Sequence, residues 1–183
     1  MATKKIAVIV GSLRKESFTR KVALTLISLA PSSLAMQIVE IGDLPLYNQD
    51  DDAAPPAAYG VFRDKLKGYD GVLFCTPEYN RSVPAALKNA IDVGSRPYGH
   101  SVWSGKPGAI VSVSPGALSA FGANHHLRQS LVFLDVPCMQ QPEAYLGNIA
   151  TQFEGNTLTN DSTRGFLQKF IDAYAAWVER NAR

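Results

Sequence analysis

The residues whose types and spacing first indicate chemistry lie between Gly11 and Thr19, directly after the β-branched run that ends at Val10. Hydroxyl groups at positions 12, 17 and 19 and the guanidinium of Arg14 are hydrogen-bond donors suited to phosphate oxygens. A helix predicted to begin at Phe18 adds free backbone N–H groups and the positive end of its dipole. The segment therefore predicts a site for an anion.

What this segment lacks narrows the choice of anion. It has no Gly-x-Gly-x-x-Gly pattern, so its backbone is not adapted to a pyrophosphate, and no Gly-Lys-Ser/Thr ending, so a Walker NTP site is excluded. A compact terminal phosphate fits better, and FMN ends in such a group whereas NAD and FAD do not. The alternative is an ordinary helix start capped by serine.

A second candidate segment spans residues 76 to 84 and follows another apolar run. Pro77 and Pro84 restrict its backbone, and Tyr79 offers an aromatic surface to a flat ring. Asn80 suits a turn, while Glu78 either anchors the loop or lies near a subunit contact. The alternative is a restrained crossover loop without a ligand.

A third segment, Ser112, Val113 and Ser114 followed by Pro115-Gly116, carries small residues that let a planar ligand approach closely. Taken alone, this third segment is weak evidence for a ligand site. In open parallel sheets, ligands bind where loops leave the carboxyl ends of the strands. We therefore expect the three segments to meet at one edge of a sheet.

The elements that position these segments alternate along the chain. Apolar runs predict strands at 6–10, 36–41, 71–75, 109–113 and 136–139, and helical spacing predicts helices at 18–29, 57–66, 84–93, 124–133 and 163–179. This alternation is typical of an α/β fold with a parallel sheet covered by helices on both faces. We expect a single domain over residues 1–183.

Bulk composition excludes several classes of protein. The chain is 46% hydrophobic with a formal charge of +2, which gives no sign of a nucleic-acid partner. No run reaches the roughly 20 apolar residues of a membrane span. The stretch from Met1 to Val10 has no cleavage site, so we expect no signal peptide and a cytoplasmic protein. Cys75 and Cys138 are interpreted as buried reduced thiols, with a disulfide or redox pair as the alternative.

Other chemistry-bearing residues have simpler interpretations. His125 and His126 lack metal-ligand spacing and are expected at a helix start or an interface rather than in acid–base chemistry. Asp50-Asp51-Asp52 is interpreted as a solvated loop, and Lys88 with Asp92 as a surface pair. The helix at 84–93 is apolar on much of its surface, which predicts an oligomer.

At this point the sequence resembles the NADPH-dependent FMN reductase family, especially its bacterial quinone, chromate and azo reductase branch. The resemblance covers essentially the whole chain. It is carried by Gly-Ser-Leu-Arg-Lys-x-Ser-Phe (11–18), Pro-Glu-Tyr-Asn (77–80), Ser-Val-Pro-x-x-Leu-Lys-Asn-Ala-Ile-Asp (82–92), His-Leu-Arg-Gln (126–129) and Val-Phe-Leu-Asp (132–135).

The resemblance implies a flavodoxin-like fold with strand order 2-1-3-4-5, non-covalent FMN, and a homodimer or homotetramer with the flavin near the subunit boundary. The residues expected to bind the cofactor are Ser12, Leu13, Arg14, Ser17, Phe18, Thr19, Pro77, Glu78, Tyr79, Asn80, Ser112, Val113 and Ser114. Two positions depart from the family. Thr19 stands where Asn is usual, and Arg81 stands where chromate-reducing relatives often have Tyr.

The implied activity is hydride transfer from NADPH or NADH through FMN to a small acceptor: a quinone, an azo compound, chromate or a free flavin. The cofactor performs this chemistry, so no catalytic side chain and no metal are expected. Arg81 is a hypothetical attractant for anionic groups, with a solvent-facing arginine as the alternative. Two further classes stay open: a flavodoxin-type electron carrier, which is usually acidic although this chain has a pI near 8.5, and a flavin-free α/β module.

Overall fold

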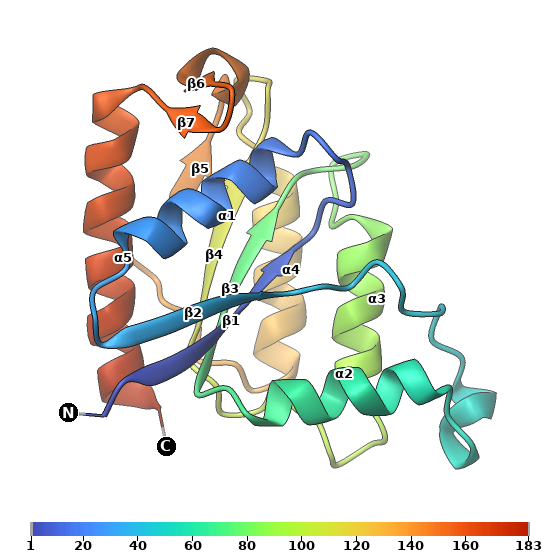
Figure 1. The fold of residues 1–183 in the computed structure, drawn as a ribbon. Coiled ribbons are helices and arrows are strands. Elements are labelled where there is room, and N and C mark those ends of the chain that lie inside the picture. Colours follow the sequence, from blue (N-terminus) through green and yellow to red (C-terminus); the bar gives the residue numbers. More distant parts are fainter. Residues whose placement is uncertain (1, 183) are drawn as a thin grey trace.

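The computed structural model describes residues 2–182, so Met1 and Arg183, the two ends of the predicted domain, lie outside the described residues. Within that range, five strands form a parallel sheet in the order β2-β1-β3-β4-β5 (Figure 1). The predicted fold class and strand order are thus confirmed. The elements are β1 (Lys4–Val10), α1 (Phe18–Leu29), β2 (Leu34–Val39), η1 (Gln49–Ala53), α2 (Ala57–Lys67), β3 (Gly71–Thr76), α3 (Ala85–Gly94), β4 (Gly108–Val113), α4 (Phe121–Phe133), β5 (Ala144–Leu146), η2 (Ile149–Gln152), β6 (Phe153–Glu154), β7 (Thr157–Leu158) and α5 (Asp161–Asn181).

The central strands are buried on both faces, which explains their unbroken apolar sequence. Alternate side chains of β1 enter different clusters: Ile6, Val8 and Val10 enter one, and Ala7 and Ile9 the other. Since successive side chains of a strand point to opposite faces, each cluster lies on one side of the sheet.

Helices cover both faces (Figure 1). Apolar residues of α1 and α5 complete the first cluster, and those of α2, α3 and α4 complete the second. Trp103, in the segment before β4, is fully buried in the second cluster, where its Nε1 donates to the carbonyl oxygen of Ile91 at 3.0 Å. Among the described helices, none combines the length and apolar character needed to span a bilayer.

The predicted fifth strand at 136–139 is wrong, because the strand that completes the sheet is β5 at Ala144–Leu146. Residues 136–139 only touch the sheet edge: Cys138 forms an isolated bridge with Gly108. Pro137 lacks the N–H that a longer ladder requires. Helix α4 also begins at Phe121, three residues before its predicted start, and the β6–β7 hairpin was not predicted.

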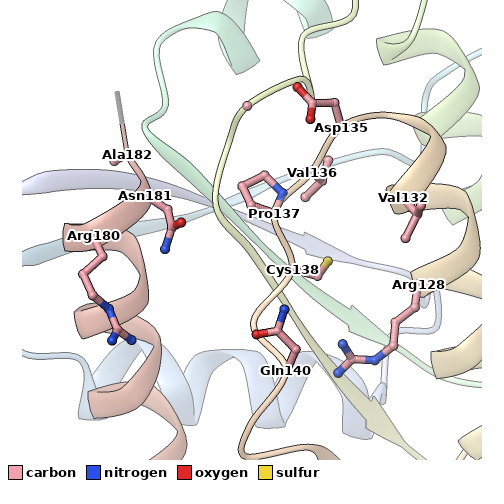
Figure 2. Close-up of a pocket in the computed structure, with 11 residues that line it drawn as sticks. Arg128, Val132, Asp135, Val136, Pro137, Cys138, Gln140, Arg180, Asn181 and Ala182 are labelled. Atoms are coloured by element: carbon pink, nitrogen blue, oxygen red, sulfur yellow. The ribbon is translucent and has the colours of Figure 1, made fainter.

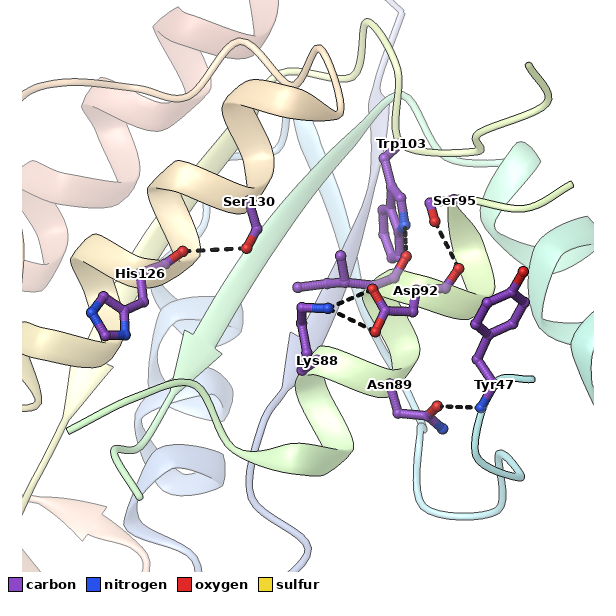
Figure 3. A network of polar contacts seen from close by, with 9 residues as sticks. Tyr47, Lys88, Asn89, Asp92, Ser95, Trp103, His126 and Ser130 are labelled. Atoms are coloured by element: carbon purple, nitrogen blue, oxygen red, sulfur yellow. Dashed lines mark hydrogen bonds and ion pairs between the residues drawn. The ribbon is translucent and has the colours of Figure 1, made fainter. Parts of the chain in front are cut away.

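The segment before α2, which includes the three aspartates interpreted as a solvated loop, contains the short 3₁₀ helix η1 and is attached to α3. The side-chain oxygen of Asn48 accepts from the N–H of Asp50 at 3.2 Å, and Asn89 Oδ1 accepts from the N–H of Tyr47 at 2.8 Å (Figure 3). Within residues 2–182, no cluster of histidine, cysteine and carboxylate side chains has the makings of a metal site. The expected surface pair is confirmed, with Lys88 Nζ 2.7 Å from Asp92 Oδ1.

The tight fit between Gly94 and Trp103 gives a prediction about stability. A Cβ at position 94 would lie 2.5 Å from Trp103 Nε1, closer than any relaxed contact. We expect Gly94→Ala to lower the free energy of unfolding by about 1–3 kcal/mol, because overpacking forces the buried indole to shift. Urea denaturation followed by circular dichroism measures this.

Gly60→Ala is the matched control, because it lies inside α2 and a Cβ there meets nothing within 4 Å. Alanine favours the helix over glycine by about 1 kcal/mol, so Gly60→Ala should leave stability unchanged or raise it. Equal stability of the two variants would contradict the packing described here.

Candidate cofactor site at the carboxyl edge of the sheet

The segment after β1 presents a row of free backbone donors. Gly11 N–H extends the β1–β3 ladder by donating to the carbonyl oxygen of Cys75 at 2.8 Å. From residue 12 to residue 17, in contrast, no backbone N–H donates to another described residue. Ser17 caps α1, and its side-chain oxygen accepts from the N–H of Arg20 at 3.1 Å. These free donors lie at the positive end of the α1 dipole, as an anion requires.

Two buried hydroxyl groups in this segment are available to a ligand. Ser12 and Thr19 are 8% and 3% exposed, and neither side chain has a hydrogen-bond partner within the described chain. Among residues 2–182, the side-chain nitrogen or oxygen that is sealed from solvent and has no hydrogen-bond partner is Arg63 Nη2. The unpaired hydroxyls of Ser12 and Thr19 are therefore not sealed, and both reach the surface. Arg14 is exposed and has no ion-pair partner in the described chain. Leu13 is 58% exposed and Phe18 is half-buried.

The first and second segments touch at Gly11. A Cβ at this position would lie 3.1 Å from Leu87 Cδ2 and 3.2 Å from Pro77 Cδ. Glycine therefore lets the loop after β1 lie directly against the loop after β3. The two predicted segments form one continuous surface, as expected from the parallel pairing of β1 with β3.

The second segment folds into a tight turn. The N–H of Tyr79 donates to the carbonyl oxygen of Ser82 at 3.1 Å, and the N–H of Ser82 donates back at 2.9 Å. Between them, Asn80 and Arg81 have φ angles of 50° and 65°, the left-handed pair that a type I′ turn requires. The interpretation of Asn80 as a turn residue is confirmed. Tyr79 is 51% exposed, so its ring is available at the surface.

Glu78 anchors this turn to α4. Its Oε2 accepts from the N–H of Ala123 in the first turn of α4 at 3.0 Å, while its Oε1 lies 3.2 Å from Arg81 Nη1. Gly122 makes the close approach possible, since a Cβ there would lie 2.7 Å from the carbonyl oxygen of Arg81. Of the two roles expected for Glu78, the structure places it as the loop anchor. Arg81 is tied to Glu78, although its side chain remains 70% exposed.

The third segment uses its hydroxyl groups internally. Ser112 is fully buried, and its Oγ donates to the carbonyl oxygen of Ser119 at 2.9 Å and accepts from Asn124 Nδ2 at 3.3 Å. Val113 is 2% exposed, and Ser114 Oγ accepts from the N–H of Gly116 at 3.0 Å. The side chains of Ser112 and Val113 are therefore committed to the core, which leaves mainly backbone groups for any ligand at these two positions.

Sequence reasoning missed an aromatic cluster at the same edge of the sheet. Phe121, His125 and Tyr145 have ring centroids 4.2 to 6.1 Å apart. Tyr145 was missed because the last strand was expected at 136–139. The exposed His125 of α4 contacts it, with Nε2 3.0 Å from Tyr145 Oη. An aromatic residue flanked by alternating apolar residues, Ala144 and Leu146, was the signal available in the sequence.

A large cavity lies away from these loops, at the amino end of β4. It has a volume of about 780 Å³ and is lined by residues that include Arg128, Cys138, Gln140 and Arg180 (Figure 2). Both cysteines are free, Cys75 buried and Cys138 half-buried, and burial raises the pKa of the Cys138 thiol to about 11. A thiol with so high a pKa is a poor nucleophile near neutral pH. The cavity thus brings together none of the predicted site residues.

Comparison with known proteins identifies the family of the chain. The model of the NADPH-dependent FMN reductase family matches residues 4–151. A quinone reductase of Pseudomonas putida is 68% identical over 177 residues, 96% of this chain and 95% of that protein. A 2-hydroxy-1,4-benzoquinone reductase of a Burkholderia species is 49% identical, over 95% of this chain and 96% of that protein. FerB, a flavoenzyme NAD(P)H:(acceptor) oxidoreductase from Paracoccus denitrificans, has a solved structure that matches with a TM-score of 0.92 at 41% identity, over 99% of this chain and all of that one.

The buried hydroxyl of Thr19 gives a prediction about phosphate binding. We expect Thr19→Val to raise the Kd for FMN about 10- to 100-fold, because a hydrogen bond to a charged group contributes roughly 1.5–3 kcal/mol. The Kd for riboflavin, which lacks the phosphate, should not change. Titration followed by flavin fluorescence measures both constants.

Thr25→Val provides the control within the same helix, because the Thr25 hydroxyl already donates to the carbonyl oxygen of Lys21 at 2.9 Å. It should leave both affinities unchanged. Equal loss of FMN and riboflavin binding in Thr19→Val would show that the hydroxyl does not contact the phosphate.

Proposed function

The chain belongs to the NADPH-dependent FMN reductase family, and from that premise we propose that it transfers two electrons from a nicotinamide nucleotide to a quinone by way of one FMN. It is an oxidoreductase that uses FMN as cofactor and NAD(P)H as co-substrate. The quinone is proposed because two relatives, at 68% and 49% identity, are named for quinone substrates. The whole chain would act as one FMN-binding domain, and a cytoplasmic location stays a prediction.

The observation that carries the proposal is the row of free donors after β1. Backbone N–H groups from 12 to 17 lie beside unpaired hydroxyls of Ser12 and Thr19 and the unpaired guanidinium of Arg14. This set fits the terminal phosphate of FMN, since it combines a helix N-terminus with neutral and charged donors. Ser17, Leu13 and Phe18 would border the same phosphate and ribityl chain.

The flavin ring is proposed to lie on the loops after β3 and β4. The type I′ turn at Tyr79–Ser82 is rigid, because its two hydrogen bonds and the anchor through Glu78 fix it to α4. Pro77 and Tyr79 offer flat apolar surface, and Ser112 to Ser114 would contribute backbone groups to the polar edge of the ring. Bound FMN supplies the hydride chemistry, and these residues hold and orient it.

Two alternatives are weaker. A flavodoxin-type carrier would exchange electrons with protein partners, but this chain has a formal charge of +2 and its relatives are named as reductases. A flavin-free module would not explain the unpaired hydrogen-bond donors after β1. Family membership favours the enzyme over both.

The proposed oligomer is a homodimer. The apolar surface proposed for its contact is not the helix at 84–93 that the sequence indicated. The apolar residues of α3 are mostly covered by the chain itself: Leu87, Ala90, Ile91 and Val93 are each at most 2% exposed, so that argument for an oligomer was wrong. Exposed apolar side chains lie instead at the end of α4, where Val132 and Phe133 are 77% and 82% exposed. Phe133 borders the same cavity as Tyr98, which is 82% exposed, and it also borders a second cavity with residues of α3, so this patch supports a self-association surface.

The proposed function is tested under anaerobic conditions on the purified holoprotein. NADPH should bleach the flavin absorption, and adding benzoquinone should restore it, with one quinone consumed for each NADPH. Parallel titration with NADH gives the preference between the two nucleotides. A flavin that keeps its colour with both nucleotides would favour an electron carrier. Bleaching by NADPH without reoxidation by quinones would support a reductase and contradict a quinone as its substrate.

The dimer is tested by light scattering coupled to size-exclusion chromatography at micromolar concentration. We expect Phe133→Lys to shift the protein toward the monomer, because a buried apolar contact becomes an unpaired charge. Leu24→Lys is the control, since Leu24 is 50% exposed on α1, which packs on the opposite face of the sheet. A monomeric wild-type protein would contradict the proposal.

A further inference from the structure

The aromatic cluster at the carboxyl edge contains a chain of hydrogen bonds. Phe121 and His125 lie one turn apart on α4, with ring centroids 4.2 Å apart, and the ring of Tyr145 stacks at 14° to that of His125. His125 Nε2 lies 3.0 Å from Tyr145 Oη, which in turn donates to Glu143 Oε1 at 2.7 Å. Phe121 is 53% exposed and His125 is exposed, so a small molecule can reach the cluster.

This cluster lies between the loops proposed to hold the flavin ring. Gly122, next to Phe121, packs against the carbonyl oxygen of Arg81, and Ala123 N–H donates to Glu78. On the other side, Tyr145 pairs with Ser112 in the register between β4 and β5. A molecule that stacks on a flavin at this edge therefore also lies near the cluster.

The direction of the hydrogen bonds fixes the tautomer of His125. Burial, and then the hydrogen bond and charge of Glu143, raise the pKa of Tyr145 to about 12, so its phenol keeps its single proton near neutral pH. That proton is given to Glu143, and Tyr145 Oη can only accept from His125. Nε2 must therefore carry a proton. Nδ1, which has no hydrogen-bond partner within residues 2–182, is then the nitrogen that can gain or release one.

We propose that His125 is the acid that protonates the quinone during its reduction, and that Tyr145 and Glu143 are positioning residues that hold its ring. The inference rests on the proposed function. A quinone that becomes a hydroquinone gains two electrons and two protons. NAD(P)H supplies the equivalent of a hydride, two electrons with one proton, and becomes NAD(P)⁺. The second proton comes from Nδ1 of the His125 imidazolium, which becomes imidazole and regains a proton from water.

The arrangement suits this role because the ring needs no rearrangement. After Nδ1 releases its proton, the imidazole still carries the Nε2 proton that Tyr145 accepts. Histidine exchanges protons near neutral pH, as a general acid must. The charged groups that face the cluster are Glu143 before β5 and Arg128 on α4, with the Glu78–Arg81 pair across from Gly122.

The kinetic test uses His125→Gln in the FMN-loaded protein, with His100→Gln as the control because His100 is an exposed loop residue. Stopped-flow mixing of NADPH-reduced protein with benzoquinone should show a rate about 10-fold or more below wild type at neutral pH, since general acids typically contribute at least that much. Reduction by NADPH, and reoxidation by ferricyanide, which takes up an electron without a proton, should be unchanged.

A second readout is independent of turnover. In ¹⁵N-labelled protein, the chemical shifts of His125, assigned by their loss in His125→Gln, should report protonated Nε2 when the ring is neutral. Tyr145→Phe removes the acceptor and should abolish this preference. His125 is exposed and Tyr145 is half-buried, and an unchanged NADPH step shows that both variants fold.

The outcomes separate the inference from the function on which it rests. If NADPH reduces the wild-type protein but quinones do not reoxidise it, both the proposed quinone reductase function and the proton-donor role of His125 are contradicted. A protein that reduces quinones equally fast with Gln at position 125, or whose neutral His125 carries its proton on Nδ1, would overturn the proton-donor role alone.

Discussion

Parallel pairing of β3 with both of its neighbours is the constraint on which the site depends. Val10 is opposite Cys75, and Thr76 is opposite Ser112, so β1, β3 and β4 end at the same level. The loops after these strands are distant in sequence and differ in composition, but the parallel pairing brings them together at one edge of the sheet. Hydrophobic side chains on both faces stabilise that register, because a slip by one residue would exchange the two clusters.

The three loops at this edge differ in whether their hydrogen-bonding groups are free or already paired. The loop after β1 leaves its backbone N–H groups free, which keeps it open to an anion. The loop after β3 instead satisfies its own groups in a closed turn and anchors itself through Glu78, which makes it rigid. The loop after β4 buries its first hydroxyl, on Ser112, among the carbonyl oxygens of its own chain. A loop with free backbone donors thus lies next to two loops whose polar groups are largely paired.

Sequence patterns predicted most of the fold and the structural roles of several residues in the candidate site, for identifiable physical reasons. The buried strands and α1 were clear because their apolar residues follow a strict period, and the limits of α1 agree residue for residue. β5 was missed because it is only three residues long, and a nearby apolar run that contains Pro137 imitated it. Glu78 and Asn80 were assigned from local chemistry. The contacts of Ser112 and the cluster around Tyr145 depend on partners far along the chain, which no local pattern reveals.

Glu78 also has a consequence beyond the loop that it anchors. It attaches the turn to Ala123 in the first turn of α4, while Phe133 ends the same helix, about 15 Å further along at 1.5 Å per residue. A helix of this length moves as a stiff rod, so whatever holds one end limits the motion of the other. By thermodynamic linkage, if the proposed subunit contact at Phe133 changes the affinity of the turn for flavin, bound flavin changes the affinity between subunits by the same factor.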